Sequence, residues 1–313
     1  MRIRIMDETS NIPALSFRGL VRKFKGFKLG PIDLDLAPGT VLGLIGPNGA
    51  GKTTTINTVV GLLKQNEGSI KIFGRETDPN DVTWKYDVGY VGDDHVFFEY
   101  WSSERNLKFV SQFYPNWSND FALKLADRFQ LDLKKRANRL SRGNRAKLAL
   151  IMALAHNPRL LLLDEPSSGL DPVVRSEFLD VLYEINKKGD TAILYSTHIL
   201  SDISRLADEL IFIKEGNFIL REKIDILTDN WKRISFEFDG SIPSLSAVTN
   251  HREDGKIHVV TSYDSIATIE HLTKIGASNI QISSMNIEEI AVEILKIKPE
   301  LLNSIFLENR ISQ

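Results

Sequence analysis

The chain has 313 residues, 42% of them hydrophobic, so it is long enough to form more than one domain with a full core. Its 39 basic and 41 acidic residues leave a formal net charge of -2, which does not indicate a nucleic-acid partner, and the absence of cysteine is consistent with a reducing cytosol. Residues 1–8 lack the apolar core of a signal peptide, and apolar runs such as residues 148–155 fall far short of the roughly 20 residues that span a bilayer.

The N-terminal part of the chain favours β-structure. Short apolar or alternating segments cover residues 14–20, 32–36 and 69–73. Between the last two of these, residues 40–45 form a nearly all-apolar run, which is typical of a parallel strand buried on both faces. Apolar residues then recur at helical spacing over residues 54–63. We therefore expect a buried strand, a short loop and a helix in that order.

The loop between this strand and this helix fits a phosphate-binding loop at every constrained position. It has the spacing G-x-x-x-x-G-K-T, in which backbone N–H groups of a tight turn converge on phosphate oxygens at a helix N-terminus. Lys52 would reach the β- and γ-phosphates, and the Thr53 hydroxyl would bind Mg²⁺. The residues expected to bind the nucleotide here are Gly46, Pro47, Asn48, Gly49, Ala50, Gly51, Lys52, Thr53 and Thr54.

The middle of the chain predicts an inserted helical subdomain. A short strand is expected at residues 88–91, and the subdomain follows over about residues 94–155. Inside it, apolar residues recur at helical spacing over residues 106–113 and 121–129. Aromatic residues crowd its entry, between residues 97 and 117. They form either local core or a surface for another subunit.

An acidic pair follows a second buried strand. Residues 159–164 contain four consecutive leucines and end in Asp164, and Glu165 comes next. In an open α/β sheet, ligands bind at the carboxyl ends of such strands. Attack on a γ-phosphate requires charge neutralisation by a metal ion and an oriented water molecule. Asp164 could organise the magnesium ligands, and Glu165 could polarise the water.

Three further segments lie around the acidic pair. Residues 140–144, which read Leu-Ser-Arg-Gly-Asn, open a helix some twenty residues before Asp164. Residues 168–171, Ser-Gly-Leu-Asp, follow the pair directly. An apolar strand at residues 191–195 then leads through a serine and a threonine to His198.

This order of motifs resembles the ATP-binding cassette (ABC) ATPases, and in particular the separate ATPase subunits of drug- and antibiotic-exporting transporters. The resemblance covers about residues 13–222. It implies that residues 46–54 form the Walker A loop and residues 160–164 the Walker B strand. Glu165 is then the catalytic carboxylate, and His198 is the switch histidine that contacts the γ-phosphate.

The resemblance also implies further contacts to the nucleotide. Residues of the family's LSGGQ signature correspond to Ser141 and Gly143, and Asp171 corresponds to its D-loop aspartate. Phe24 occupies the place where the family stacks an aromatic ring on adenine. A core phenylalanine is the alternative reading of this position, and Phe27 is close by.

Two positions depart from the family pattern. The signature has Arg142 and Asn144 where the family has glycine and glutamine. After the strand at residues 88–91, Asp93 aligns with a glutamine that touches magnesium and water in the family, and Asp94 is the alternative for this role. A carboxylate is a good ligand for a hard cation. The predicted metal ligands are therefore Thr53, Asp93 and Asp164.

After residue 221 the pattern changes to alternation, which indicates a small α+β domain. The expected strands lie at residues 234–238, 257–260 and 280–282, and the expected helices at residues 265–275 and 287–295. We place the boundary so that residues 1–228 form the ATPase domain and residues 229–313 an accessory domain. Without the accessory domain the cassette is expected to fold and bind ATP. Three histidines, His251, His258 and His271, lack metal-ligand spacing and are expected at the surface.

The predicted fold is α/β, with a P-loop ATPase core, an N-terminal antiparallel β portion, an inserted helical subdomain and the α+β accessory domain. The resemblance implies an ATP hydrolase with ATP and Mg²⁺ as cofactors, driving a separate membrane permease from the cytoplasmic face of the membrane. Since one cassette supplies half of each site, we expect a head-to-tail dimer, with a homodimer as the default. A different ATPase as the second subunit is the alternative. The alternative function is a non-transport ATPase that acts as a nucleotide-dependent clamp on a macromolecule.

Overall fold

The computed structural model describes residues 12–240, 242–243, 245 and 247–297. The prediction for residues 1–8 therefore lies outside the described residues. The chain forms two compact units, one with residues 12–208 and 215–217, the other with residues 209–214 and 218–297. In the described part of the chain, no helix combines the length and apolarity that a membrane span requires.

The first unit contains the predicted antiparallel β portion. Its strands are β1 (Leu15–Phe24), β2 (Phe27–Leu36), β4 (Glu67–Ile72) and β5 (Arg75–Glu76), in the order β2-β1-β4-β5. The pairs β1–β2, β1–β4 and β4–β5 are all antiparallel. β1 and β2 extend beyond the predicted segments because they continue as one hairpin to the turn that joins them.

Parallel strands form the centre of the first unit. They are β3 (Val41–Ile45), β8 (Ala192–Thr197), β7 (Leu160–Asp164) and β6 (Val88–Val91), adjacent in that order. Every residue of β3, β7 and β8 is buried, which explains the apolar runs that make up β3 and most of β7 and β8. The segments that leave the carboxyl ends of these strands meet at one edge of the sheet.

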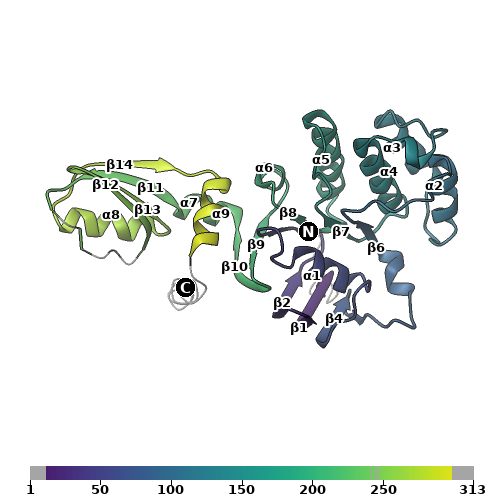
Figure 1. The fold of residues 1–313 in the computed structure, drawn as a ribbon, viewed down its shortest axis with the longest axis horizontal. Coiled ribbons are helices and arrows are strands. Elements are labelled where there is room, and N and C mark those ends of the chain that lie inside the picture. Colours follow the sequence, from purple (N-terminus) through teal and green to yellow (C-terminus); the bar gives the residue numbers. More distant parts are fainter. Residues whose placement is uncertain (1–11, 241, 244, 246, 298–313) are drawn as a thin grey trace, which may run out of the picture. The chain divides into compact units, whose positions relative to one another are not determined.

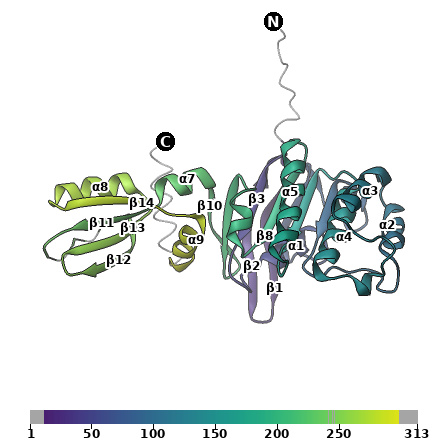
Figure 2. The same ribbon diagram turned by 90° about the horizontal axis from the view of Figure 1, so that it is seen from above.

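Helices surround this sheet, and a group of them forms the predicted inserted subdomain. Figure 1 shows α2, α3 and α4 gathered together, apart from β1, β2 and β4, and Figure 2 shows the same grouping. The helices of the first unit are α1 (Lys52–Val59), α2 (Ser103–Ser111), α3 (Asn119–Arg128), α4 (Arg142–Leu154), α5 (Pro172–Lys187) and α6 (Leu200–Ile203), with 3-10 turns at Thr83–Asp87 and Ala137–Arg139.

Helix α1 differs from its predicted extent. It begins at Lys52 rather than at residue 54, and it ends at Val59 rather than at residue 63. Gly61 takes a φ of 77°, a left-handed conformation that terminates a helix. The apolar periodicity beyond this glycine therefore does not belong to the helix.

The second unit begins with a strand pair that precedes the predicted boundary. β9 (Glu209–Lys214) and β10 (Asn217–Lys223) are neighbours, and α7 (Ile224–Asn230) follows them. α9 (Ile287–Lys296) packs against both α7 and β9, and the Lys214 Nζ donates a hydrogen bond of 2.7 Å to the Leu295 carbonyl. The predicted boundary between residues 228 and 229 falls inside this unit.

The rest of the second unit is an antiparallel sheet with its own core. Its strands follow the order β12 (Val248–Asp254), β13 (Ile257–Ser262), β11 (Lys232–Glu237) and β14 (Ser278–Ser284). Helix α8 (Ser265–Lys274) lies along this sheet (Figures 1 and 2). The core consists of Ile234, Phe236, Val260 and Leu272. This arrangement agrees with the predicted α+β class of the accessory domain.

The expectation that all three histidines of this unit are surface residues is wrong for His258. Its side chain is fully buried, and its ring stacks on Phe236 with ring centroids 5.4 Å apart. His258 pairs directly with Phe236 across the sheet. Sequence spacing alone could not show this, because the contact depends on the register between two strands.

Candidate active site

A cavity of about 620 Å³ lies in the first unit at the carboxyl edge of the parallel sheet. Residues that follow four different strands line it, as expected for an open α/β sheet. The predicted site residues among its lining are Asn48, Gly49, Gly51, Lys52, Thr53, Thr54, Asp93, Glu165 and His198. Phe27 and Ser168 also line it.

The loop between β3 and α1 has the conformation that a phosphate-binding loop needs. Gly49 and Gly51 have φ values of 78° and 115°, in the left-handed region where a side chain is strained. Gly51 is the N-cap of α1, so no side chain occupies the N–H groups of its first turn. Ala50, which belongs to the loop, is buried. The lining and the backbone therefore fit the phosphates of ATP.

Lys52 lines the cavity and is held by several oxygen atoms. Its Nζ donates to the carbonyl of Gly46 at 2.8 Å and to that of Pro47 at 3.2 Å. The same Nζ lies 3.2 Å from the Glu165 Oε1, and the lysine side chain is only 5% exposed. A buried ammonium group needs such partners, and these oxygens hold it at the loop.

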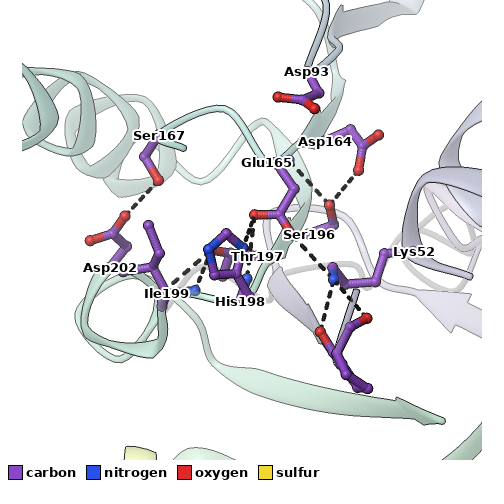
Figure 3. A network of polar contacts seen from close by, with 12 residues as sticks. Lys52, Asp93, Asp164, Glu165, Ser167, Ser196, Thr197, His198, Ile199 and Asp202 are labelled. Carbon is purple, nitrogen blue, oxygen red and sulfur yellow. Dashed lines mark hydrogen bonds and ion pairs between the residues drawn. The ribbon is translucent and has the colours of Figure 1, made fainter. Parts of the chain in front are cut away.

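Glu165 links Lys52 to His198, as Figure 3 shows. The His198 Nδ1–H donates to the Glu165 Oε2 at 2.7 Å. Glu165 itself has a φ of 49°, a rare conformation for a residue with a side chain. Its backbone N–H donates to the Ser196 carbonyl at 3.1 Å, which holds the turn in place. Non-glycine residues in such conformations cluster at functional sites.

Asp164, which directly precedes Glu165, is 1% exposed and is the last residue of β7. The Ser196 Oγ donates to its Oδ1 at 2.6 Å, across the register of β7 and β8 (Figure 3). Burial raises the pKa of Asp164, and the nearby charges of Glu165 and Asp93 raise it further. Hydrogen bonds from Ser196 and Thr53 act in the opposite direction. The net effect is a raised pKa.

Arg142 of the signature and Asp93 after β6, where the sequence departs from the family pattern, lie close to each other. The Arg142 Nη2 is 3.7 Å from the Asp93 Oδ1, and both side chains are more than half exposed. A Cβ placed on Gly169 would come within 2.7 Å of the Arg142 guanidinium carbon, so this guanidinium lies against the D-loop backbone. Asp93 lines the cavity, whereas Asp94 is not among its lining residues.

The signature and D-loop residues cap helices of their own chain. The Ser141 Oγ accepts a hydrogen bond of 3.3 Å from the Asn144 N–H at the start of α4. The Asp171 Oδ1 accepts from the N–H groups of Val173 and Val174, each at 3.1 Å, at the start of α5. Ser141, Gly143 and Asp171 are not among the residues that line the cavity.

The aromatic residue at the cavity is Phe27 rather than the predicted Phe24. Phe24 is 42% exposed, and the Arg22 guanidinium lies 4.7 Å from the centre of its ring. The two phenylalanines pair across the β1–β2 hairpin, with ring centroids 6.4 Å apart. The stacking role of Phe24 stays a prediction, and Phe27 is a second candidate that the sequence alone could not rank.

A buried hydrogen-bond chain supports the loop that carries Glu165. The Tyr195 hydroxyl donates to the Ser167 Oγ at 2.9 Å. This Oγ donates in turn to the Asp202 Oδ2 at 2.6 Å, as Figure 3 shows. Arg175 of α5 approaches the same Asp202 oxygen at 3.9 Å. All three members of the chain are buried. No sequence motif marked Ser167 or Asp202, because their contact depends on how the segments after β7 and β8 pack.

Comparison with known proteins decides the family. The family profile described as ABC transporter matches residues 29–168. The uncharacterized ABC transporter ATP-binding protein YdbJ of Bacillus subtilis (strain 168) is 30% identical over 262 residues, which are 81% of this chain and 85% of that protein. The chain belongs to the ATP-binding proteins of ABC transporters.

Two further comparisons agree with this assignment. The bacitracin transport ATP-binding protein BcrA of Bacillus licheniformis is 29% identical to this ABC ATPase over 273 residues, covering 84% of the chain and 89% of that protein. A solved ATP-binding subunit of an ABC transporter is 27% identical, with a TM-score of 0.63, and the match covers 69% of this chain and 92% of that one. The predicted family, fold class and ATPase function are confirmed: this protein is the ATP-hydrolysing subunit of a transporter.

Proposed function

We propose that this ABC ATPase hydrolyses Mg²⁺-bound ATP at sites shared between two copies of the chain, and thereby drives a separate permease that exports an antibiotic. The proposal that two copies share each site is supported by the position of the signature residues. Ser141 and Gly143 do not line the cavity that contains Lys52, Glu165 and His198. A second copy, related by two-fold symmetry, would supply them along with Asp171.

Each cavity residue takes a separate role in this proposal. The phosphate loop and Lys52 bind the phosphates, and Thr53, Asp164 and Asp93 hold Mg²⁺. When bound, the ion supplies positive charge that neutralises the γ-phosphate oxygens. The donor set supports this role, because Asp164 and Thr53 lie within hydrogen-bonding reach and Asp93 lines the same cavity.

Glu165 acts as the base that orients and deprotonates the attacking water. In the structure, its Oε1 pairs with Lys52 and its Oε2 with His198. Phosphate oxygens would compete for the Lys52 ammonium group and release Oε1 to accept a hydrogen bond from water. His198, which lines the same cavity, would keep Oε2 oriented.

The permease is proposed to contact an aromatic cluster of the helical subdomain. Phe98 stacks on Trp101 with ring centroids 4.3 Å apart, and Phe109 meets both rings edge-on. Phe98 and Phe113 are 47% and 58% exposed. In the family this region faces the membrane subunit, so the exposed rings support the interface alternative. The ATPase would then lie on the cytoplasmic face of the membrane.

The export of an antibiotic rests on the relative BcrA, which is named for bacitracin transport. The test is co-expression of this ATPase with its permease in a bacitracin-sensitive host. Increased resistance that disappears in a Glu165→Gln variant would support export. Unchanged resistance, with the complex assembled and hydrolysing ATP, would contradict this choice of substrate.

The shared site has a complementation test. Lys52→Ala disables the phosphate loop, and Gly143→Asp places a negative charge where the signature would meet phosphate. The aspartate suits the first turn of α4, and its Cβ would lie 3.2 Å from the Val174 side chain, which requires only a small shift. Each variant alone should be inactive. Mixed in equal amounts they should recover up to about one quarter of the wild-type activity, since half of the dimers then have one intact site.

No recovery on mixing, with both variants folded and exchanging subunits, would mean that the active site is not shared between two copies of this chain. The alternative, in which a different ATPase is the second subunit, would then be favoured over the homodimer.

A further inference from the structure

The second unit brings together three side chains that the ATPase function does not use. They are His251, Glu253 and His258, and their ligand atoms all lie within 4.8 Å of one another. His251 and Glu253 belong to β12, and His258 belongs to β13.

The register of these strands explains the cluster. Glu253 pairs directly with His258, and His251 lies two residues before Glu253, opposite Val260. Residues two apart on a strand point to the same face, and directly opposite residues share a face as well. All three side chains therefore project from one face at the β12 edge of the sheet.

His258 is held in the orientation and tautomer of a metal ligand. Its Nε2–H donates to the Phe238 carbonyl at 3.2 Å, and its ring is fully buried against Phe236. In the neutral imidazole the other nitrogen, Nδ1, then carries a lone pair, which can accept a hydrogen bond or bind a metal ion. A hydrogen bond from one ring nitrogen to a backbone carbonyl is the usual support of a histidine that binds metal through the other.

The His258 Nδ1 points at its neighbour. It lies 3.1 Å from the His251 Nε2. Two nitrogens bound to one tetrahedral zinc ion at 2.0–2.1 Å are about 3.4 Å apart, so the two rings already have nearly the required separation. Both His251 and Glu253 are exposed, and they can adjust without disturbing the core.

We propose that His251, Glu253 and His258 bind a divalent transition-metal ion of the Zn²⁺ type. Imidazole nitrogens favour zinc, nickel and copper over magnesium, so the site would be chemically distinct from the magnesium site at the nucleotide. Two histidines and one carboxylate leave a coordination position for water or an outside ligand.

Bound metal would join the edge strand β12 to β13 and, through His258, to Phe238. Phe238 packs against the core of this unit. The ion would thus fix an edge strand whose residues are mostly exposed. Since binding to the folded state alone stabilises it, metal should raise the melting temperature of this unit.

The proposal is tested by titrating the full-length chain, without a polyhistidine tag or nucleotide, with ZnCl₂ against a chromophoric chelator. We expect about one zinc ion per chain, and His251→Asn or Glu253→Gln should weaken binding by about ten-fold or more. Both substitutions are at exposed positions, so folding is not at risk. His271→Asn, on helix α8, is the matched control and should bind zinc like the wild type.

Cobalt provides a second readout, since Co²⁺ in a tetrahedral site with imidazole ligands absorbs visible light. The absorption should appear in the wild type and the His271→Asn control, and it should be lost in His251→Asn. Equal zinc affinity in the wild type, His251→Asn and Glu253→Gln would overturn the proposal, as would no zinc binding at all. Zinc binding lost in Asp164→Asn but kept in His251→Asn would place the ion at the nucleotide site and also overturn it.

Discussion

At the scale of single residues, Glu165 is held by more contacts than a base alone requires. Lys52 and His198 each pair with one of its carboxylate oxygens, and its backbone N–H donates to Ser196. These contacts stabilise a backbone conformation that is unfavourable for glutamate by itself. The residue is therefore held in one orientation by the protein itself, which lowers the cost of orienting it for catalysis.

Glu165→Gln should leave ATP binding within a few-fold of the wild type while lowering kcat by about 100-fold or more. Glutamine keeps the size of the side chain and loses the basic carboxylate. The measurement is steady-state phosphate release alongside an ATP dissociation constant from calorimetry. A ten-fold or smaller loss of kcat would show that another group is the principal base.

Asp164→Asn should stabilise the nucleotide-free protein at neutral pH, by on the order of 1 kcal/mol. Burial raises the pKa of Asp164 above its ordinary value of 3.8, so the folded state binds a proton more readily than the unfolded state. The wild type therefore loses stability as pH rises from about 4 through the raised pKa, and asparagine does not. Melting temperatures between pH 4 and pH 7 should diverge, with the variant higher.

The control for this prediction is Ser196→Ala, which removes a donor to the same carboxylate and should lower the melting temperature. An unchanged melting temperature in Asp164→Asn across this pH range would contradict the raised pKa.

The two phenylalanines of the β1–β2 hairpin can be separated by substitution. We expect Phe27→Ala to weaken ATP binding by about 1–2 kcal/mol, since Phe27 lines the cavity and an aromatic ring stacks favourably on a base. Phe24→Ala should have the smaller effect. Titration with ATP and with a triphosphate lacking the adenine base measures the difference. The reverse order of effects would return the stacking role to Phe24.

At the scale of elements, the sequence predicted most accurately the strands that are buried on both faces. β6 has the predicted bounds, and β7 differs by one residue, because continuous apolar runs bounded by glycine or acid have few alternative structures. The phosphate loop was predictable for the same local reason: its backbone chemistry lies within one short segment.

β12 and α7 were missed, and their sequences explain why. β12 is an edge strand with the sequence VTNHRED, which has no apolar alternation. α7 has seven residues, too few for a helical period to be read with certainty. The cross-strand partners His251 and His258 and the placement of Phe27 were unpredictable because they depend on register and packing.

Asp93, in the loop after β6, pairs with Arg142 at the start of α4 and is also a predicted magnesium ligand. The magnesium role can be tested by substitution. Asp93→Gln should retain substantial ATPase activity, whereas Asp93→Ala should raise the Mg²⁺ concentration needed for half-maximal activity. Asp94→Ala is the control for alignment. Magnesium titrations that coincide for the wild type and both alanine variants would remove these carboxylates from the metal site.

At the scale of the whole molecule, the division of the chain into two units can be tested with two deletion variants, one of them made at the predicted boundary. Deleting residues 229–313 removes α9 and leaves β9 and α7 without the helix that packs on them. The apolar face of α9, formed by Ile287, Ile290, Ala291 and Ile294, is buried in the intact chain. We expect this deletion to aggregate.

Excising residues 233–283 should be tolerated better. Lys232 and Ser284 are paired on adjacent strands, so their Cα atoms are about 5 Å apart and a short glycine-serine linker can join them. This variant keeps α7 and α9 and removes the sheet with its own core. It should bind ATP like the full chain and melt at a higher temperature than the 229–313 deletion. Equal solubility and ATP binding of the two variants would support the predicted boundary between residues 228 and 229.

The buried chain from Tyr195 through Ser167 to Asp202 has a consequence for motion at the active site. Ser167 lies two residues after Glu165, and Asp202 lies four residues after His198. The segment that carries Glu165 and the segment that carries His198 are therefore joined by a buried hydrogen bond in addition to the Glu165–His198 pair itself. Lifting either segment breaks the same buried hydrogen bonds, so both share one free energy of local opening and would fluctuate as a single cooperative unit.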